Sequence, residues 1–552
     1  MAIPPDNDPS SPLNRREQTF PLLNEEMAAR LVKYGVEEVV PAGTVLFRQG
    51  DRRIDYFFVI DGCIEIYDLD KEGQPNVFVV HGPAQFTGEV ELFSERQVMV
   101  NGRTGSESRL IRVDPVGFRK LVSGEPDIGE IIMRAFILRR VALIQGGQGG
   151  VTLAGSAHAA DTVRLRSFLI RNGYPYRLLD TDVDEDAMHL LDCLGLHPSE
   201  CPVVVLPDRR VLRCPSTVQL ADELGITILL DSEHVHDVAV IGAGPAGLAA
   251  AVYAASEGLD TLVLEALAPG GQAGTSSKIE NYLGFPTGIS GQALAGRAQV
   301  QAMKFGAHMA IARSVQGMDC TKHPYRLLLD DGTSVSARAV VVATGARYRK
   351  LDLVDYERFE GQGIHYAATA MEATLCAGEE VIVVGGGNSA GQAAVFLART
   401  AAHVHILVRG EGLASTMSDY LVQRIAQSPR ITLHTRCQVD HLDGDVYLRE
   451  VGWKCADGVQ KRMKAGSLFV MIGAEPNTAW LDGCLDLDRK GFVLTGRDAD
   501  GYATPSPYAT TLRGVFAVGD VRSGSIKRVA SGVGEGSVVV QAIHRFLNPS
   551  SM

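Results

Sequence analysis

The sequence contains no pair of cysteines in C-x-x-C spacing, although nine cysteines are spread over its 552 residues. Their odd number and wide scatter exclude a disulfide scaffold, a zinc ribbon and a local dithiol motif, and we expect no metal centre. Positive charge is also scarce, with 53 Lys and Arg against 65 Asp and Glu and a formal net charge of -12. This balance argues against binding to nucleic acid or an anionic membrane as the main role. Small-molecule ligands or protein partners are therefore expected.

Long uninterrupted hydrophobic runs are missing as well. The stretches at 141–160, 238–256 and 381–398 carry no charge and are long enough to cross a bilayer, but each contains clustered glycines. Such glycines would break a membrane helix, so we expect no membrane span. Residues 1–20 are rich in Pro, Asp, Ser and Asn and have no apolar core, which predicts a disordered lead and a cytoplasmic protein.

The length predicts three or four domains at roughly 150 residues each. Between Gly35 and Gly88, closely spaced turn signals separate short alternating runs, which predicts an antiparallel sandwich or barrel within a domain at 21–145. Residues 151–230 follow the order βαβαββα, the thioredoxin or glutaredoxin arrangement. From residue 237 onward, the pattern of strand, glycine turn, helix and strand occurs twice.

The first glycine turn reads GAGPAG at 242–247 and follows an apolar strand. Gly242 permits a tight turn, Gly244 lets a pyrophosphate approach backbone N–H groups, and Gly247 lets the helix pack closely on the strand. Glu265 ends the next strand, where a carboxylate accepts ribose hydroxyls and would repel a 2'-phosphate. This unit predicts a site for FAD or NAD, and the alternative is a glycine-rich turn without a ligand.

The second glycine turn, GGGNSA at 385–390, has Gly385, Gly387 and Ala390 in the same three places. Arg409 follows the next strand, where the first unit has an acid. Because a guanidinium pairs with a 2'-phosphate, NADPH is favoured and NADH is the alternative. The other interpretation of Arg409 is a surface arginine without a ligand.

Residues 237–552 resemble the low-molecular-weight thioredoxin reductases over that family's whole length. The motifs that carry the resemblance are GAGPAG, PGGQ (269–272), IENYLGFP (279–286), ATGA (343–346), GGGNSA, IGAEPNT (472–478) and GVFAVGDVRSGSIKRVASGVGEG (514–536). The resemblance implies a multidomain α/β protein with two Rossmann-like domains, and relatives that are two-fold dimers suggest a homodimer. Its FAD domain, at 235–355 and 481–552, would be split around an NAD(P)H domain at 356–480.

The glycine turns and the resemblance together assign contact residues. Those expected at FAD are Gly242, Gly244, Gly247, Glu265, Gly271, Gln272, Asn281, Asp520, Arg528, Val529 and Ala530. Those expected at the nicotinamide cofactor are Gly385, Gly387, Asn388, Ser389, Ala390, Arg409, Ile472 and Gly473.

The sequence departs from this family at its redox motif. The family carries a CATC-like dithiol just before the second glycine turn, but here Ala367 and Ala370 stand in the two cysteine positions. Because a thiolate must attack the flavin and alanine cannot, the usual disulfide reductase mechanism is excluded locally. We interpret Cys376, the nearest cysteine, as a small buried hydrophobe.

The family's HRRxxxR phosphate clamp is also reduced, to VRGEGLA at 408–414. It keeps Arg409, while Gly410 and Ala414 replace the other two arginines. We therefore expect weakened selectivity for NADPH, with Ser415, Thr416 or Arg424 as alternative partners of the phosphate.

The thioredoxin-like segment lacks its usual chemistry too. Its loop after the first strand reads SAHAAD at 156–161, where a C-x-x-C would lie, and Pro202 occupies the place of a common cis-proline. The fusion is similar to the flavoprotein subunit of alkyl hydroperoxide reductase. We expect this domain to dock a partner or a lid, or to be structural; Cys193, Cys201 and Cys214 offer an alternative thiol pair.

The runs GTVLFRQGD (43–51) and YFFVIDGCIEIY (56–67) resemble the opening of cyclic-nucleotide-binding domains, which implies an N-terminal β-barrel. Gly88, Glu89 and Arg96 match the phosphate cassette, in which backbone N–H groups and an arginine hold the cyclic phosphate. Glu95 and Val98 replace the cassette's proline and alanine. The barrel is thus predicted to bind a cyclic nucleotide, or to be silent or repurposed.

These motifs predict an FAD-dependent NAD(P)H oxidoreductase that passes a hydride from NAD(P)H to FAD. The reduced flavin would pass its electrons to a protein or small-molecule acceptor other than an internal dithiol. A ligand of the barrel, such as a cyclic nucleotide, is the candidate regulator of this reaction. The alternative is a redox or nucleotide sensor whose flavin state a partner reads without turnover.

Overall fold

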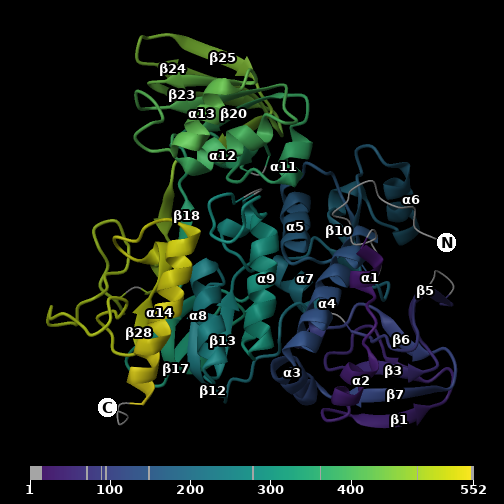
Figure 1. Cartoon of the computed structure of the whole chain (residues 1–552). Coiled ribbons are helices and arrows are strands. Elements are labelled where there is room, and N and C mark those ends of the chain that lie inside the picture. The colour runs from purple at the N-terminus through teal and green to yellow at the C-terminus, as the bar shows by residue number, and fades with distance from the viewer. Residues whose placement is uncertain are drawn as a thin grey trace. The chain divides into compact units, whose positions relative to one another are not determined.

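The computed structural model describes residues 15–69, 73–88, 90–93, 96–146, 150–276, 279–360, 362–481 and 483–548, and Figure 1 labels their helices and strands. The chain forms two compact units. The first contains Met1–Gly155, Leu165–Asp231 and Val300–Arg313, and the second contains Ser156–Arg164, Ser232–Gln299 and Ser314–Met552. The bounds of the four domains expected from the sequence stay predictions. Among the described residues, no helix combines the length and the apolar character needed to cross a membrane.

The first part of unit 1 is antiparallel, as predicted from its short alternating runs. Its strands are β1 (Val36–Val40), β2 (Val45–Phe47), β3 (Tyr56–Asp61), β4 (Ile64–Leu69), β5 (Pro75–His81), β6 (Asn101–Thr104) and β7 (Ser108–Val113). Its helices are α1 (Arg16–Thr19), α2 (Glu25–Leu31), η2 (Val90–Phe93), α3 (Pro115–Gly124) and α4 (Pro126–Gly146). The strands pair in the orders β1-β7-β3 and β2-β6-β4-β5. These pairings among the described strands form two sheets and do not show closure into a barrel.

Aromatic side chains join β3 to helices α3 and α4. The Tyr56 ring lies 5.1 Å from Phe118, and the Phe118 ring lies 5.9 Å from Phe136. Arg139 of α4 is buried in this core, and its Nη1 donates to the Gly88 carbonyl at 3.2 Å. Because a buried guanidinium is costly without acceptors, this bond ties α4 to the chain at Gly88.

Residues 151–223 have the predicted order of strands and helices, and all of them belong to unit 1 except Ser156–Arg164, which belongs to unit 2. Their elements are β8 (Val151–Ala154), α5 (Ala160–Arg171), β9 (Tyr176–Leu179), α6 (Glu185–Leu194), η3 (Pro198–Glu200), β10 (Val203–Val205), β11 (Val211–Arg213) and α7 (Thr217–Glu223). The sheet order is β11-β10-β8-β9, with β8 parallel to β9 and antiparallel to β10. The Cys201–Pro202 bond is cis. The element order is confirmed, and a thioredoxin-like classification stays a prediction.

Unit 2 contains a first sheet whose central strands are parallel. Its elements are β12 (Val235–Ile241), α8 (Pro245–Ser256), β13 (Thr261–Glu265), η4 (Ala273–Thr275), β15 (Val315–Asp319), β16 (Tyr325–Leu329), β17 (Ser334–Val342), β28 (Val515–Ala517), η6 (Gly519–Val521) and α14 (Val529–Leu547). Helix α9 (Gly291–Lys304) begins in this unit, and β14 (His308–Ile311) belongs to unit 1. The strand order is β13-β12-β17-β16-β15, and β28 pairs in parallel with β17. The chain thus leaves this sheet after β17 and returns to it at β28.

The intervening chain builds a second parallel sheet, in the order β19-β26-β20-β21-β22. Its elements are α10 (Tyr356–Phe359), β19 (Ile364–His365), α11 (Ala370–Leu375), β20 (Glu380–Val384), α12 (Asn388–Leu397), β21 (His403–Val408), α13 (Asp419–Gln427), β22 (Ile431–Thr435) and β26 (Ser467–Val470). A three-stranded sheet of β23 (Cys437–Gly444), β24 (Leu448–Cys455) and β25 (Gln460–Lys464) accompanies it. Strands β18 (Ala346–Tyr348) and β27 (Ala474–Pro476) pair with each other, and η5 (Ala479–Leu481) follows. Near-continuous apolar strands such as β20 suit a sheet covered on both faces.

Two disulfides occur among the described residues, Cys320–Cys484 and Cys437–Cys455. Cys437 and Cys455 lie opposite each other on β23 and β24. The scattered cysteines gave no sign of either pair, because both depend on strands and loops that only the fold brings together. Neither disulfide has C-x-x-C spacing.

Candidate functional site

The first glycine turn has the geometry that its sequence predicts. Gly242 has a φ of +101°, and a Cβ on it would lie 2.4 Å from the Ala343 carbonyl oxygen. A Cβ on Gly247 would lie 1.9 Å from the Gly242 oxygen. Both positions therefore exclude any side chain. Gly244 differs, because its Cβ would meet nothing closer than the Gly271 Cα at 4.0 Å.

This open space at Gly244 lies at the N-terminus of α8, where Gly244 is the N-cap. The unpaired N–H groups of a helix start favour an anion, and a bare glycine lets a phosphate approach them. The turn therefore fits a pyrophosphate, because protein atoms would fill this position in a turn that served packing alone.

Glu265 is fixed beside the turn at the end of β13. It is only 9% exposed, and its Oε2 accepts the Ala243 N–H at 2.7 Å. Its Oε1 accepts the N–H groups of Leu267 and Ala268 at 3.0 and 3.3 Å. These bonds hold the carboxylate in one place next to the helix start, which is where a ribose hydroxyl would be bound.

The loop after β13 approaches the same turn. A Cβ on Gly271, whose φ is +53°, would lie 3.0 Å from the Gly244 Cα. The side-chain amide of Gln272 donates to the Ala346 carbonyl at the start of β18. Asn281 is exposed on the next loop. Gly271 is thus brought to the turn, whereas no contact joins Asn281 to it.

Helix α14 lies against α8 (Figure 1) and brings the C-terminal segment to this site. A Cβ on Gly536 would lie 2.1 Å from the Ala246 carbonyl oxygen, and one on Gly519 would lie 2.9 Å from the Ala246 Cβ. These close approaches place η6, which contains Asp520, near the first turn of α8. Burial raises the pKa of the Asp520 carboxyl above its usual value, and the Lys527 ammonium offsets part of this.

The predicted contacts Arg528, Val529 and Ala530 start α14, with Arg528 as its N-cap. Sequence reasoning missed Glu535, one residue before Gly536 in the same motif. Its Oε2 accepts the Gly519 N–H at 2.7 Å, and its Oε1 accepts from Arg522 at 2.6 Å. Glu535 is 9% exposed, so this buried pair fixes the turn that carries Asp520. The sequence feature that could have identified Glu535 is an acidic residue inside a glycine-rich helix.

The second glycine turn repeats the first. Gly385 has a φ of +139°, and a Cβ on it would lie 2.2 Å from the Met471 carbonyl oxygen. Gly387 is the N-cap of α12, and a Cβ on it would meet no atom within 4 Å. Ala390 is fully buried. Asn388 uses its Oδ1 to accept the Ser418 N–H at 2.7 Å, which ties α12 to the start of α13.

The residues expected at a 2'-phosphate do not converge. Arg409 and Ser389 are exposed. Thr416 donates from its hydroxyl to the Gly386 carbonyl at 2.6 Å, so it lies beside the turn. Arg424 instead forms an ion pair with Glu280 at 2.6 Å. Among the alternative partners of the phosphate, Thr416 therefore contacts the turn and Arg424 is paired elsewhere.

At the two positions where the resemblance places the family's cysteines, Ala367 and Ala370 provide no thiol. Ala367 lies between β19 and α11, and Ala370 is the first residue of α11. Cys376 is fully buried, and burial raises the pKa of its thiol to about 11. A thiol with so high a pKa is protonated near neutral pH and a poor nucleophile, which supports the interpretation of Cys376 as a hydrophobe.

The cysteines of the thioredoxin-like segment do not form a disulfide. Cys193, Cys201 and Cys214 are free, and the Cys214 Sγ points to the Cys201 carbonyl oxygen at 3.4 Å. The loop at the C-x-x-C position has polar contacts instead: the Ser156 Oγ lies 3.2 Å from the Tyr447 Oη, and the His158 ring packs edge-on against Tyr447.

The phosphate cassette is only partly described. Gly88 has a φ of +110°, and a Cβ on it would lie 2.4 Å from Leu92. Glu89 lies outside the described residues. Arg96 and Arg119 line a cavity of about 10 Å³, room for a single water molecule. A nucleotide at Arg96 would require this cavity to open.

A larger cavity of about 680 Å³ lies in unit 2, within the range of about 300–1,000 Å³ usual for ligand pockets. Gly473, whose carbonyl accepts the Arg349 N–H at 2.9 Å, forms part of its wall, next to Ile472. Most of the charged side chains around it are basic: Arg349, Arg489, Lys490, Arg522 and Lys527, with Asp488 as the acid.

Comparison with known proteins gives two family matches. Residues 236–536 match the pyridine nucleotide-disulphide oxidoreductases, and residues 37–125 match the cyclic nucleotide-binding domain. The chain is 31% identical over 364 residues to NADPH-dependent thioredoxin reductase 3 of Arabidopsis thaliana, covering 62% of this chain and 66% of that protein. It is 32% identical over 318 residues to thioredoxin reductase of Escherichia coli O157:H7, covering 56% of this chain and 95% of that protein.

Solved structures agree. The crystal structure of Lactococcus lactis thioredoxin reductase in its FR conformation is similar with a TM-score of 0.52 and 28% identity, covering 57% of this chain and 99% of that one. T. acidophilum thioredoxin reductase gives the same TM-score and identity, covering 56% and 98%.

Proposed function

Since the chain belongs to the pyridine nucleotide-disulphide oxidoreductase family, with residues 236–536 matching it, we propose that it is an FAD-dependent NAD(P)H oxidoreductase without an internal dithiol. The observation that carries this proposal is the pair of glycine turns, in which Gly244 and Gly387 each leave a helix start open. Two such turns on two parallel sheets fit two dinucleotides. When both cofactors are bound, the flavin accepts a hydride from the nicotinamide.

The first turn is proposed to hold FAD. The carboxylate of Glu265 is already oriented by three backbone N–H groups, so binding a ribose would require little reorganisation. Asp520 and the start of α14 are brought to the same helix by close glycine contacts. The printed names of the thioredoxin reductase relatives support the assignment of the family's cofactors to this chain.

The second turn is proposed to hold NADPH, with NADH as a weaker alternative. Arg409 is exposed and free to meet a 2'-phosphate at the surface, and Thr416 adds a hydroxyl beside the turn. Because the other two clamp arginines are replaced by Gly410 and Ala414, the preference for NADPH over NADH is expected to be modest.

The reduced flavin is proposed to pass its electrons to an acceptor other than the chain's own thiols. Ala367 and Ala370 remove the dithiol, and Cys376 is buried with a raised pKa. The cavity of about 680 Å³ next to Gly473 is large enough for a small acceptor such as a quinone. A carrier protein or a partner's disulfide is the other class of acceptor.

An anaerobic titration of the purified holoprotein with NADPH tests this proposal. The yellow flavin absorbance is expected to bleach on addition of about one equivalent, and NADPH consumption is expected to become continuous when a quinone or ferricyanide is added. A protein without flavin, or a bound flavin that NADPH does not bleach, would refute it. Bleaching without turnover on any acceptor would favour the sensor.

The cyclic nucleotide-binding domain is proposed to bind a regulatory small molecule. Residues 37–125 match this family, and Gly88 keeps the positive φ of a phosphate-binding turn. Calorimetry with cyclic AMP and cyclic GMP on the full chain tests the ligand class. Binding that Arg96→Ala leaves unchanged would remove Arg96 from the phosphate site.

A further inference from the structure

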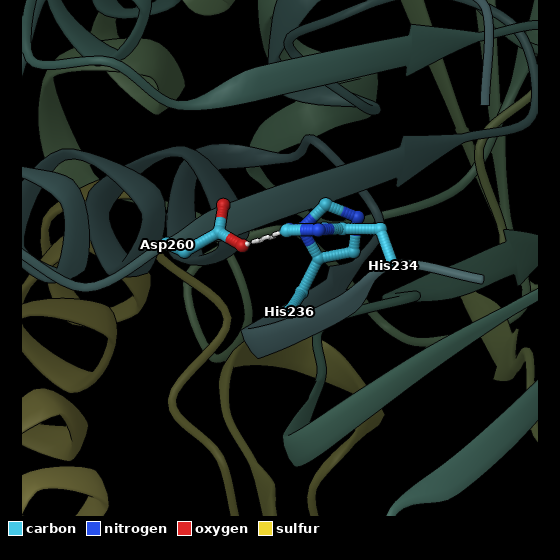
Figure 2. A group of neighbouring side chains, drawn as sticks. All are labelled: His234, His236 and Asp260. Atoms are coloured by element: carbon cyan, nitrogen blue, oxygen red, sulfur yellow. Dashed lines mark hydrogen bonds and ion pairs between the residues drawn. The ribbon is translucent and has the colours of Figure 1, made fainter. Parts of the chain in front are cut away.

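Two histidines and an aspartate meet at the amino end of the first parallel sheet. His234 directly precedes β12, His236 is the second residue of β12, and Asp260 directly precedes β13. Because β12 and β13 are parallel, their amino ends lie at the same edge of the sheet. Residues two apart on a strand point to the same side. Figure 2 shows both imidazole rings directed at the Asp260 carboxylate.

The three side chains offer their donor atoms at ligand spacing. The Asp260 Oδ2 lies 2.6 Å from the His234 Nε2 and 3.0 Å from the His236 Nδ1. The two imidazole rings are 4.6 Å apart between centroids. All three potential ligand atoms lie within 4.8 Å of one another.

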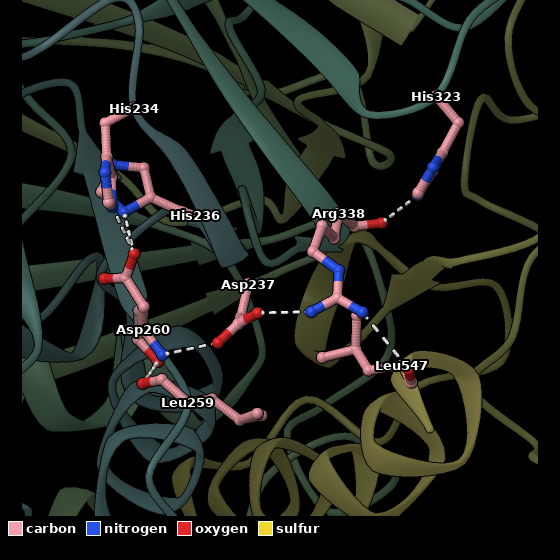
Figure 3. A network of polar contacts seen from close by, with 9 residues as sticks. His234, His236, Asp237, Leu259, Asp260, His323, Arg338 and Leu547 are labelled. Carbon is pink, nitrogen blue, oxygen red and sulfur yellow. Dashed lines mark hydrogen bonds and ion pairs between the residues drawn. The ribbon is translucent and has the colours of Figure 1, made fainter. Parts of the chain in front are cut away.

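The backbone that carries Asp260 is held independently of its carboxylate (Figure 3). The Asp260 N–H donates to the Asp237 Oδ2 at 3.1 Å, and the Asp237 Oδ1 accepts from Arg338 at 2.8 Å. Arg338 also donates to the Leu547 carbonyl at 3.3 Å. This network fixes the strand ends while leaving the Asp260 side chain to the two histidines. Preorganised supports of this kind are what a ligand set requires.

The cluster is enclosed on one side and open on the other. The His236 side chain is 10% exposed and that of Asp260 33%, whereas the His234 side chain is 52% exposed. An ion would therefore have a buried imidazole and a half-buried carboxylate behind it, and solvent access past His234.

We propose that His234, His236 and Asp260 bind one divalent zinc ion. Two imidazoles and a carboxylate are ligands that zinc accepts, and three protein ligands leave the fourth tetrahedral position to water. At zinc–ligand bonds of about 2.0–2.1 Å, tetrahedral ligand atoms lie about 3.3 Å apart. The observed separations of 2.6 and 3.0 Å would have to widen by less than about 1 Å, which side-chain rotation supplies at the exposed His234.

This ion would lie away from the cofactor turns. Five residues of β12, 237–241, lie between His236 and Gly242, a span of roughly 20 Å at about 3.3 Å per residue. The segment Ser232–Gln299 of unit 2 begins just before the cluster, so the ion would fasten the first residues of this segment to the edge between β12 and β13. The inference is independent of the proposed oxidoreductase activity.

The test uses the full-length flavoprotein, freed of metal by a chelator and titrated calorimetrically with zinc chloride. One zinc per chain is expected for the wild type, with elemental analysis as the count. His234→Ala and Asp260→Asn are expected to weaken binding at least about a hundredfold, since loss of a mere supporting partner costs about 10–100-fold. His234 is half exposed, so its replacement should leave the fold and the flavin content unchanged.

The matched control is His434→Ala. The His434 Nε2 lies 3.0 Å from the His405 Nδ1 on neighbouring strands β22 and β21, so this variant removes an imidazole from a different histidine pair. It is expected to bind zinc as the wild type does. Zinc binding that survives both His234→Ala and Asp260→Asn, or that is lost in His434→Ala, would overturn the proposal. So would a wild-type protein that binds no zinc.

Discussion

The two glycine turns have the same backbone but different surroundings. In each turn, the first glycine lies against a carbonyl oxygen from the neighbouring parallel strand's end, Ala343 for Gly242 and Met471 for Gly385. In each, the second glycine leaves the helix start open. The third position differs: Gly247 has no room for a Cβ, whereas Ala390 is a buried methyl group. Close packing thus maintains the same turn on both sheets, so selectivity for one dinucleotide over another must come from other residues.

We expect the selectivity for one dinucleotide over another to come from the residue at the end of the next strand. Glu265 is buried and holds three backbone N–H groups, while Arg409 is exposed. A buried, prepositioned acid suits a cofactor that stays bound, and an exposed arginine suits one that exchanges. We therefore expect substitutions in the first turn to remove the flavin and substitutions in the second to change kinetics only.

The largest effect is expected for Gly244→Ala. Its φ is -69°, so alanine fits the backbone, and the new methyl group would occupy the space open to a phosphate. Such overpacking costs about 1–3 kcal/mol, or roughly ten- to a hundredfold in FAD affinity. The flavin-to-protein ratio after gel filtration measures it.

Gly296→Ala is the matched control for this variant, because a Cβ at this helical position also meets no atom within 4 Å. It should retain its flavin. If Gly244→Ala retained flavin equally well, the first turn would not be the pyrophosphate site.

Gly387→Ala is expected to rank second. Its φ is -94° and its Cβ position is open, so the protein should fold and keep its flavin. The concentration of NADPH needed for half-maximal flavin reduction should rise by at least about tenfold, since about 1.4 kcal/mol is lost at the phosphate contact. Anaerobic stopped-flow reduction measures this. Loss of flavin with unchanged NADPH dependence would reverse the assignment of the two turns.

Glu265→Gln should have a smaller effect, which lowers both the affinity for FAD and the stability of the fold. Glutamine keeps one acceptor oxygen where the carboxylate serves three backbone N–H groups. Hydrogen bonds to a charged group contribute about 1.5–3 kcal/mol and those to a neutral group about 0.5–1.5 kcal/mol. The substitution should therefore cost roughly 1 kcal/mol, and both the thermal midpoint and the FAD affinity are expected to fall. Thermal unfolding with and without added FAD separates the two. An unchanged midpoint in the absence of FAD would show that the buried bonds do not stabilise the turn.

Arg409→Ala is expected to have the smallest effect. An exposed ion pair is worth about 0.5–1 kcal/mol, so kcat/KM for NADPH should fall roughly two- to fivefold while that for NADH stays the same. The measurement is the ratio of kcat/KM for NADPH to kcat/KM for NADH. Arg424→Ala is the control, since Arg424 is paired with Glu280, and a larger loss of the ratio in that variant would transfer the phosphate contact to Arg424.

The sequence was sufficient for features that depend on neighbours along the chain. Strand, glycine turn and helix are contiguous, so Gly242 and Gly385 adopt the positive φ values that their motif requires. The burial expected of Cys376 is likewise confirmed.

Other parts of the candidate site could not be predicted in this way. Arg424 was a candidate for the phosphate, and the structure pairs it with Glu280. Glu535 was overlooked, although it holds the turn that carries Asp520. Nothing in the spacing of the cysteines indicated the Cys320–Cys484 disulfide. In each case the partner lies outside the local motif, between 16 and 164 residues away along the chain.

The sequence by itself determined the local chemistry of this protein: two helix starts without side chains, an acid and an arginine at the following strand ends, and alanine at positions 367 and 370. Only the tertiary structure decided which distant groups meet, such as β28 with β17, Gly536 with Ala246, and His234 and His236 with Asp260. The physical reason is that a turn follows from the conformational preferences of adjacent residues, whereas the pairing of strands and the meeting of side chains follow from the packing of the whole sheet.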